Sequence, residues 1–195
     1  MVWAMILAAG ESRRMGQPKL LLPLEGRTII EMVMTNILQS RIDGILVVLG
    51  SNAEKIGERI KDFPVKETVN PHFQEGMLSS IQWGFECLPK NTRAALVILG
   101  DQPSIPSSVV DQIIEAHQDT AKGIVLPVYE GKRGHPLLID MKYRDDVKRL
   151  SPEIGLRQLV YDHEQDLLEI EVNTPCILRD IDTLEDYRKE IEYGR

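Results

Sequence analysis

Two short segments of the chain combine small residues with charged side chains suited to phosphate and metal chemistry. The first runs from Leu7 to Lys19 (LAAGESRRMGQPK) and follows an apolar stretch. Its small residues let a ligand approach the backbone, and successive loop amides can form a nest for an anion. Arg13, Arg14 and Lys19 add positive charge that suits phosphate. The segment predicts an anion site, although a solvated basic turn has the same composition, and it is neither a Walker A loop nor a GxGxxG fingerprint.

The second segment, LGDQP from Leu99 to Pro103, places a carboxylate directly after another apolar run. Open α/β sheets bind their ligands beyond the carboxyl ends of the strands, where Asp101 is expected to lie. Carboxylate oxygens there suit Mg²⁺ held beside a triphosphate. The alternative is an Asp101 that only caps a helix or closes a loop.

Two further segments carry polar groups with weaker signals. The stretch from Asn70 to Ser80 follows a predicted strand and should reach the same edge of the sheet, but it also fits a helix start. The stretch GKRGHP, from Gly131 onward, contains Arg133 and His135, which suit an anionic group. A tight hairpin turn would have the same sequence, so both segments stay open to a structural interpretation.

A pair of carboxylates lies near the end of the sequence, in RDIDTLED. Asp180 and Asp182 alternate along a segment expected to be extended, so their side chains should point to the same side. Such a pair can contribute to a metal site. Asp182 or Thr183 would equally serve as the cap of a terminal helix.

Apolar runs alternate with helical patterns and would position these groups on one sheet. Strands are expected at 3–8, 44–50, 65–69, 94–99, 124–129, 136–139 and 167–172. Helices are expected at 28–38, 52–61, 76–88, 104–117, 142–150, 154–162 and 182–191. Strand–helix alternation favours right-handed crossovers and parallel strands. We therefore predict one α/β domain over residues 1–195, a Rossmann-like three-layer fold with a mostly parallel central sheet and a small β insertion near 131–134.

Composition narrows the class of partner. The 195 residues are 43% hydrophobic and 27% charged, with a net charge of −7, which disfavours nucleic acid and anionic membranes as partners. Cys87 and Cys176 lie far apart and outside any metal-binding spacing. The apolar N-terminal run is too short to span a membrane, and its basic pair follows the run, unlike a signal peptide. We expect a cytoplasmic protein that acts on small molecules.

Taken in order, these motifs resemble those of the molybdenum cofactor nucleotidyltransferases, in the MobA-like NTP transferase superfamily. The carriers are LAAGESRRMGQPK, NPHFQEGMLSSI, LGDQP, KRGHP and DIDTLEDY, which together cover nearly the whole chain. The AAGES opening and the RGHP turn are similar to the cytidylyltransferase branch, whereas the guanylyltransferases tend to open with AGG. Leu184 departs from the family pattern, which often has Pro there; the position is a helix start, so the departure puts little of the expected chemistry in doubt.

The resemblance implies a Mg²⁺-dependent transfer of CMP from CTP to the terminal phosphate of molybdopterin, with release of pyrophosphate, in service of a molybdenum hydroxylase or its maturation chaperone. It implies catalytic roles for Arg14, Lys19 and Asp101, and metal ligation by Asp101 and Asp182 with Asp180 as partner. The implied nucleotide-binding residues are Leu7, Ala8, Ala9, Gly10, Ser12, Arg14, Lys19, Asn70, Ser80 and Asp101. The implied acceptor-binding residues are Gln102, Pro103, Arg133, Gly134, His135 and Pro136.

Four alternatives remain at this point. The chain could be a guanylyltransferase acting on the same cofactor, or a nucleotidyltransferase acting on a sugar or alcohol phosphate. It could also be a non-catalytic chaperone for the pterin cofactor, which would predict damaged basic or metal positions; Arg14, Lys19, Asp101 and Asp182 are intact. A NAD-type dehydrogenase is disfavoured because the first loop lacks GxGxxG.

Overall fold

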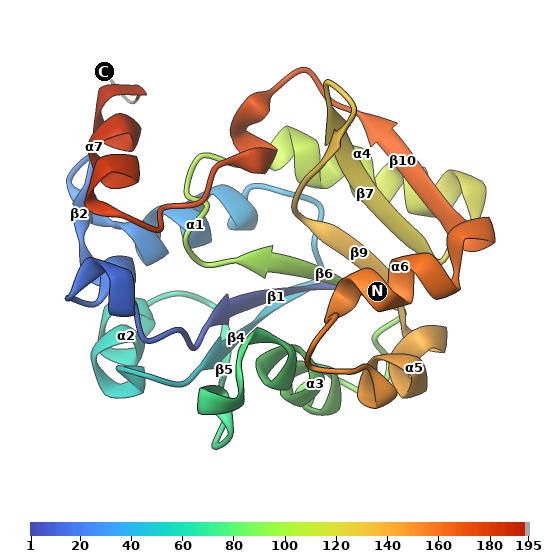
Figure 1. Cartoon of the computed structure of the whole chain (residues 1–195), viewed down its shortest axis with the longest axis horizontal. Coiled ribbons are helices and arrows are strands. Elements are labelled where there is room, and N and C mark those ends of the chain that lie inside the picture. The colour runs from blue at the N-terminus through green and yellow to red at the C-terminus, as the bar shows by residue number, and fades with distance from the viewer. Residues whose placement is uncertain (194–195) are drawn as a thin grey trace.

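The computed structural model describes residues 1–193, which form a twisted sheet with helices on both faces (Figure 1). The sheet has eight strands in the order β10-β7-β9-β6-β1-β4-β5, with β8 paired to β7. The strands are β1 (Val2–Ala8), β4 (Gly44–Leu49), β5 (Lys66–Val69), β6 (Ala94–Leu99), β7 (Ile124–Tyr129), β8 (Lys132–Arg133), β9 (Leu137–Asp140) and β10 (Leu167–Glu171). A separate hairpin joins β2 (Pro23–Leu24) to β3 (Arg27–Thr28).

The central strands are parallel, as the alternation of strands and helices predicted. Strand β1 lies between β4 and β6 and runs parallel to both, with Leu7 level with Val48 and Leu99. The predicted β insertion is also present: β8 folds back on β7, and β9 lies antiparallel between β6 and β7. The α/β fold and its mostly parallel sheet are thus confirmed.

The helices cover the sheet in two layers. They are α1 (Ile29–Leu38), α2 (Ala53–Ile60), α3 (Met77–Cys87), α4 (Ser107–Thr120), α5 (Arg144–Arg149), α6 (Leu156–Asp162) and α7 (Leu184–Tyr193). One hydrophobic cluster lies under α1, α2 and α4, and the other under α3, α5 and α6. Within residues 1–193, no helix combines the length and the apolar character needed to cross a membrane.

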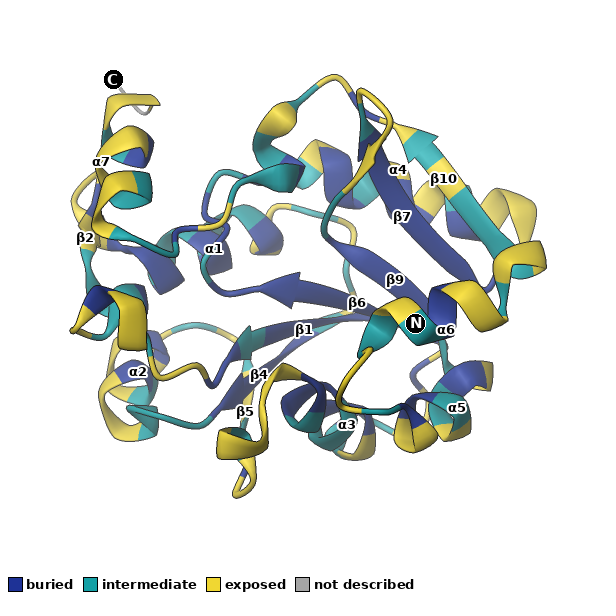
Figure 2. Cartoon of the chain, in the orientation of Figure 1, coloured by how far each residue is buried: buried dark blue, intermediate teal, exposed yellow. Residues whose placement is uncertain are grey.

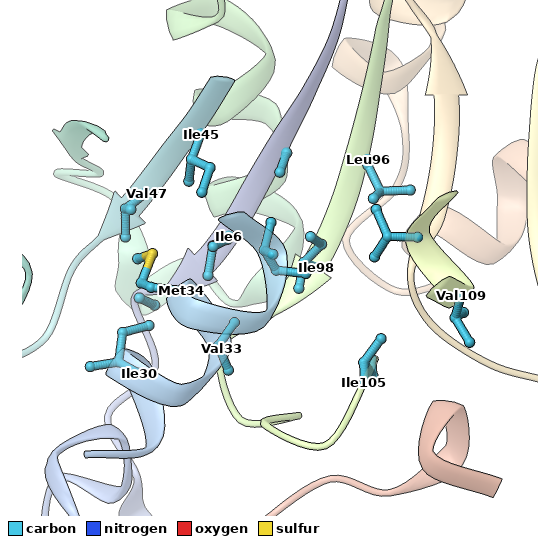
Figure 3. Close-up of a cluster of buried hydrophobic side chains, with 14 of the residues drawn as sticks. Ile6, Ile30, Val33, Met34, Ile45, Val47, Leu96, Ile98, Ile105 and Val109 are labelled. Atoms are coloured by element: carbon cyan, nitrogen blue, oxygen red, sulfur yellow. The ribbon is translucent and has the colours of Figure 1, made fainter. Parts of the chain in front are cut away.

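Strand β1 supplies side chains to both layers, which explains its unbroken apolar sequence. Ala4 and Ile6 belong to the first cluster, and Trp3 and Met5 belong to the second. Figure 3 shows Ile6 facing the buried side chains of α1. Burying an aliphatic side chain of this size stabilises the fold by about 1.5–3 kcal/mol. The core therefore fixes β1 and β6, whose carboxyl ends carry the first two motifs.

Element boundaries differ from the expected ones by a few residues, for local reasons. Helix α4 begins at Ser107, after Pro106, which is its extended N-cap. Helix α6 begins at Leu156 because Gly155, with a φ of 68°, has a left-handed backbone that cannot continue a helix. The β2–β3 hairpin was not predicted from the sequence.

Candidate active site

The loops that follow β1 and β6 surround a cavity of about 480 Å³. We call it the larger cavity, because a second cavity beside it has a volume of about 410 Å³. It is lined by Leu7, Ala9, Gly10, Glu11, Ser12, Arg13, Arg14, Lys19, Leu20, Phe73, Gln74, Gly76, Met77, Ser80, Leu99, Asp101, Asp180 and Asp182. In Figure 2 the strands entering this region are buried, whereas the loop beyond β1 is largely exposed. Residues from four distant segments of the chain therefore meet at one edge of the sheet, as the parallel topology predicted.

A largely buried lysine lines the larger cavity between two carboxylates. The Lys19 ammonium donates to Asp101 Oδ2 and, at 2.9 Å, to Asp182 Oδ1. Arg14 Nη2 lies 2.8 Å from the other Asp182 oxygen, Oδ2. The Lys19 and Asp101 side chains are only 14% and 16% exposed. Two carboxylates and two cations thus form one ion-pair network.

The network shifts the pKa of its members. Burial alone would lower the pKa of Lys19, but the Asp101 carboxylate, and after it Asp182, raise it above its ordinary value. Burial alone would raise the pKa of Asp182, but hydrogen bonds and charge from Lys19 and Arg14 lower it. Both shifts favour the charged forms. Lys19 and Asp182 are therefore both charged at neutral pH.

Local backbone structure holds Lys19 in this place. Ser12, with a φ of 55°, turns the chain into a short 3₁₀ segment, Arg13–Met15. Ser12 Oγ accepts a hydrogen bond of 3.1 Å from the Lys19 amide. The buried Leu20 side chain anchors the loop in the core. Ser12 therefore has a structural contact in addition to the nucleotide role expected from its motif.

Asp101 is positioned by a close approach between two strands. The Gly100 amide donates to the Leu7 carbonyl at 3.0 Å, and a Cβ at Gly100 would lie 2.7 Å from the same oxygen. On the other side, the Asp101 carbonyl accepts from the Ile181 amide at 3.1 Å. Only glycine fits between the strand ends, so Gly100 of the LGDQP motif is required for this geometry.

Asp182 is positioned by the start of α7. Thr183 caps this helix: its Oγ1 accepts from the Asp186 amide at 3.2 Å, while Asp186 Oδ2 accepts from the Thr183 amide at 2.8 Å. This reciprocal pair fixes the backbone directly after Asp182. The cap and the carboxylate are therefore adjacent but distinct: Thr183 caps α7, and Asp182 lines the larger cavity.

A second cavity, of about 410 Å³, adjoins the first at Asp180, which lines both. It is lined by Gln102, Leu126, Arg133, Gly134, His135, Leu137, Leu156, Arg157, Val160, Tyr161, Ile177, Leu178 and Asp180. Gln102 Nε2 donates to Asp180 Oδ1 at 2.7 Å. Among residues 1–193, Gln102 Oε1 and His135 Nδ1 have no hydrogen-bond partner although both are buried. These orphaned atoms make the boundary of the cavities suited to a polar ligand.

Burial dominates the ionisation of this boundary. It lowers the pKa of His135, although the charges of Asp180 and Asp101 act in the opposite direction. It raises the pKa of Asp180, an effect that the Gln102 hydrogen bond opposes and the nearby charge of Asp101 reinforces. The imidazole is therefore neutral near pH 7.

Four of the residues expected in the site lie outside both cavities. Ala8 is buried in the core beneath α1, because alternate β1 residues point to opposite faces. Asn70 is buried too, and its Nδ2 donates to Ser79 and Ser80 at 3.0 Å, so it supports the cavity wall. Pro103 instead lines a smaller cavity beside α7, and Pro136 is buried. The side chains of these four residues do not face the ligand sites.

The structure also adds residues that the motifs did not single out. Phe73, Gln74 and Met77 line the larger cavity, and four residues of α6 line the second one. The only signal for α6 was its helical periodicity, which places Leu156 with Val160, and Arg157 with Tyr161, four residues apart on one face.

The residues of the larger cavity fit a divalent cation. Lys19 already places a positive charge between Asp101 and Asp182, so two hard oxygen donors converge on one point. Residues 1–193 contain no cluster of three or more acidic, His or Cys side chains suited to a metal. Mg²⁺ commonly takes one or two carboxylates and completes its shell with water and substrate phosphates. The protein would therefore supply part of the shell and a nucleotide the rest.

Comparison with known proteins agrees with this arrangement. Residues 4–167 match the family model described as the MobA-like NTP transferase domain. The chain is 29% identical over 185 residues to the molybdenum cofactor cytidylyltransferase of Escherichia coli K12, covering 93% of this chain and 91% of that protein. It is 30% identical over 193 residues to the nicotine blue oxidoreductase of Paenarthrobacter nicotinovorans, covering 94% and 93%. The structure of Rv0371c from Mycobacterium tuberculosis H37Rv superimposes with a TM-score of 0.87 at 25% identity, covering 98% and 97%.

Proposed function

This chain belongs to the MobA-like NTP transferase family, and from that premise we propose that it transfers CMP from CTP to the terminal phosphate of a molybdopterin-type cofactor. One observation carries the proposal: Lys19 lies between Asp101 and Asp182, beside Arg14, in a cavity that meets a second one at Asp180. A nucleotide in the first cavity and an acceptor in the second would meet at that boundary. We further propose that residues 1–195 act as one domain, in the cytoplasm, on small molecules.

The chemistry requires little covalent participation by the protein. An acceptor phosphate oxygen attacks the α-phosphorus of CTP, and a new P–O bond forms. The bond from the α-phosphorus to the bridging oxygen breaks, and pyrophosphate leaves with the electron pair. The second pKa of a phosphate monoester is about 6, so the acceptor is largely dianionic and needs no general base. Positioning and charge neutralisation therefore dominate the catalysis.

The residues of the larger cavity have roles that follow from their positions. Asp101 and Asp182 would hold Mg²⁺, which supplies charge neutralisation at the phosphates when bound. Lys19 and Arg14 stabilise the negative charge that builds on the departing pyrophosphate. The loop amides around Gly10 bind phosphate oxygens. At the boundary, His135 and the second Nε2 hydrogen of Gln102 would donate to the acceptor phosphate, since Gln102 Oε1 can only accept.

The preference for CTP rests on the first loop. Ala9 lines the larger cavity at the position beside Gly10, where the related guanylyltransferases tend to have glycine. An alanine methyl group there narrows the cavity, which should penalise a purine more than a pyrimidine. Shape alone discriminates by roughly 10–200-fold. We expect a clear preference for CTP without absolute exclusion of GTP.

Pyrophosphate release tests the proposal. The protein is incubated with CTP, GTP or ATP, with and without molybdopterin, before and after removal of divalent metal with EDTA. We expect release that requires acceptor and metal, and kcat/KM for CTP above that for GTP by roughly 10–200-fold. A GTP value equal to or above the CTP value would refute the cytidylyltransferase assignment. Release only with a sugar or alcohol phosphate would refute the acceptor.

A matched pair of variants separates the enzyme from a non-catalytic carrier. Asp101→Asn should lower turnover at least about 100-fold, because the metal that would stabilise transition-state charge loses one of its two carboxylate ligands. Asp119→Asn, on the exposed face of α4, makes the same chemical change away from the site and should leave turnover unchanged. Thermal melting confirms that both variants fold. Equal turnover in the two variants would contradict the metal role of Asp101.

A further inference from the structure

Helix α6 forms a wall of the second cavity that the proposed function leaves without a role. Four of its seven residues line the cavity: Leu156, Arg157, Val160 and Tyr161. The buried Val160 and Leu159 anchor the helix in the second hydrophobic cluster. In Figure 1, α6 lies near β9, and β9 supplies Leu137 to the same cavity. The helix is therefore held rigidly with one face toward the cavity.

Arg157 is the uncommitted cation of this cavity. The other arginine, Arg133, donates through Nε to Glu169 Oε1 at 2.5 Å. Within the part of the chain that the structure describes, the exposed Arg157 guanidinium forms no hydrogen bond and no ion pair. A guanidinium group only donates, and its planar fork suits paired acceptor atoms. The cavity thus offers an unpaired fork of N–H donors.

Tyr161 and the apolar wall define the shape of the ligand that this fork could meet. Tyr161 is 69% exposed, which is a high exposure for a large aromatic side chain. It lines the same cavity as Arg157. Leu126, Leu137 and Val160 supply an apolar surface and are 4%, 5% and 7% exposed. Two aromatic rings that stack with an offset gain about 0.5–1.5 kcal/mol beyond the area that they bury. This combination fits a planar heteroaromatic ring that carries hydrogen-bond acceptors.

The layout of the two cavities assigns the ends of such a ligand. No residue of α6 lines the larger cavity, and Asp180 is the residue common to both linings. A phosphate that reacts with a nucleotide must lie near that boundary, so the remainder of the acceptor extends toward α6.

We propose that α6 determines which acceptor is used: Tyr161 stacks on the acceptor's heteroaromatic ring, and Arg157 donates to ring carbonyl or ring nitrogen atoms. The inference rests on the proposed function and adds its specificity-determining residues. If this face of α6 is only solvated, neither side chain will affect binding of the acceptor.

Binding of free pterin, which lacks phosphate and metal, tests the inference without turnover. Fluorescence titration compares the wild type with Arg157→Gln, Tyr161→Ala and Tyr161→Phe. We expect the first two changes to raise the Kd for pterin at least tenfold, about 1.4 kcal/mol, and Tyr161→Phe to change it less than about twofold. Arg149→Gln, on the neighbouring α5, removes an exposed arginine that is paired with Asp146, and serves as the control. The Kd for Mg·CTP should stay constant throughout.

Each outcome decides one of the two claims. Absence of pterin binding by the wild type, or equal affinity in Arg157→Gln, overturns the role of α6. Arg157→Gln could instead weaken the binding of inorganic phosphate while its affinity for pterin stays at the wild-type value. Arg157 would then bind the phosphate end of the acceptor, and this result would also overturn the role of α6. If pterin binding depends on Arg157 and Tyr161 but CTP and molybdopterin yield no pyrophosphate, the transferase proposal fails and the role of α6 stands. If Arg157→Gln and Tyr161→Ala both release pyrophosphate with the wild-type KM for the acceptor, the role of α6 fails and the transferase proposal stands.

Discussion

Replacing Lys19 by Met should make the nucleotide-free protein bind divalent metal more tightly, while it lowers turnover. The Lys19 ammonium now contacts Asp101 and lies 2.9 Å from Asp182 Oδ1, so it occupies the place where a metal would bind. A metal that enters without nucleotide must displace this internal cation. With nucleotide bound, the ammonium can move to the phosphates and release both carboxylates. Lys19 would thereby favour entry of the metal together with the nucleotide.

The size of the effect follows from the charges and their burial. Two unit charges about 4 Å apart interact by about 4 kcal/mol at an effective dielectric constant of 20. Removing one partner of a buried pair costs about 3–5 kcal/mol, because the other charge is left uncompensated. The Asp182 side chain is 31% exposed, so solvent screens part of its interaction with the Lys19 ammonium. An uncompensated energy of about 1.4–3 kcal/mol would then favour the metal, which corresponds to roughly 10–150-fold in Kd.

Titration with Mn²⁺, followed by electron paramagnetic resonance of the free ion, measures this Kd without nucleotide. Lys61→Met is the matched control, since Lys61 pairs with Glu58 on the surface of the protein and its removal changes the net charge equally. Lys19→Arg keeps the cation and should keep metal affinity low. Thermal melting establishes that each variant is folded. Affinity for Mn²⁺ in Lys19→Met that equals or falls below the wild-type value would refute the reasoning.

Three further changes test the framework around the site. Gly100→Ala should destabilise the protein by about 1–3 kcal/mol in chemical denaturation and reduce turnover, because its Cβ would lie 2.7 Å from the Leu7 carbonyl oxygen; unchanged stability would contradict the close approach. Burial lowers the pKa of His135, so the folded state binds fewer protons there than the unfolded chain, and stability should fall as pH drops below about 6.5. In His135→Gln, the free energy of unfolding from denaturation curves should fall less between pH 7 and pH 5 than in the wild type. An identical fall would show that the His135 imidazole is not its cause. Thr183→Ala removes the cap shared with Asp186 and should cost about 1 kcal/mol, visible as a lower Tm, whereas an unaltered Tm would show that the cap is dispensable.

The parts of the fold that could be predicted are those with a strong local signal. Strands β1 and β6 are apolar at every position, which marks strands covered on both faces and places Asp101 at a sheet edge. The same uniformity hides which face each side chain points to, so the inward orientation of Ala8 could not be predicted. The backbone of Ala8 still borders the loop, which is why the motif alone pointed to it.

Other features depend on tertiary contacts that no local pattern records. Pro103 follows directly after Gln102, yet its carbonyl accepts from Asn36 Nδ2 at 2.6 Å, and this contact pulls it toward α1. The α6 wall comes from a segment about 20 residues beyond the RGHP motif and carries no charge pattern of its own. Its place at the cavity follows from contacts with α5 and from the packing of Leu159 and Val160 in the second hydrophobic cluster, which a sequence pattern does not specify.

One stretch of chain, residues 177–182, borders both cavities. The Ile177 carbonyl accepts from the His135 amide at 3.0 Å, and the Ile181 amide donates to Asp101 at 3.1 Å. A ligand that shifts this stretch from one side therefore alters the fit on the other. Thermodynamic linkage makes the effect reciprocal: whatever factor an acceptor contributes to the affinity for nucleotide, the nucleotide must contribute to the affinity for acceptor. We expect the two substrates to bind cooperatively, so that the order in which they arrive affects the kinetics but not the stability of the assembled ternary complex.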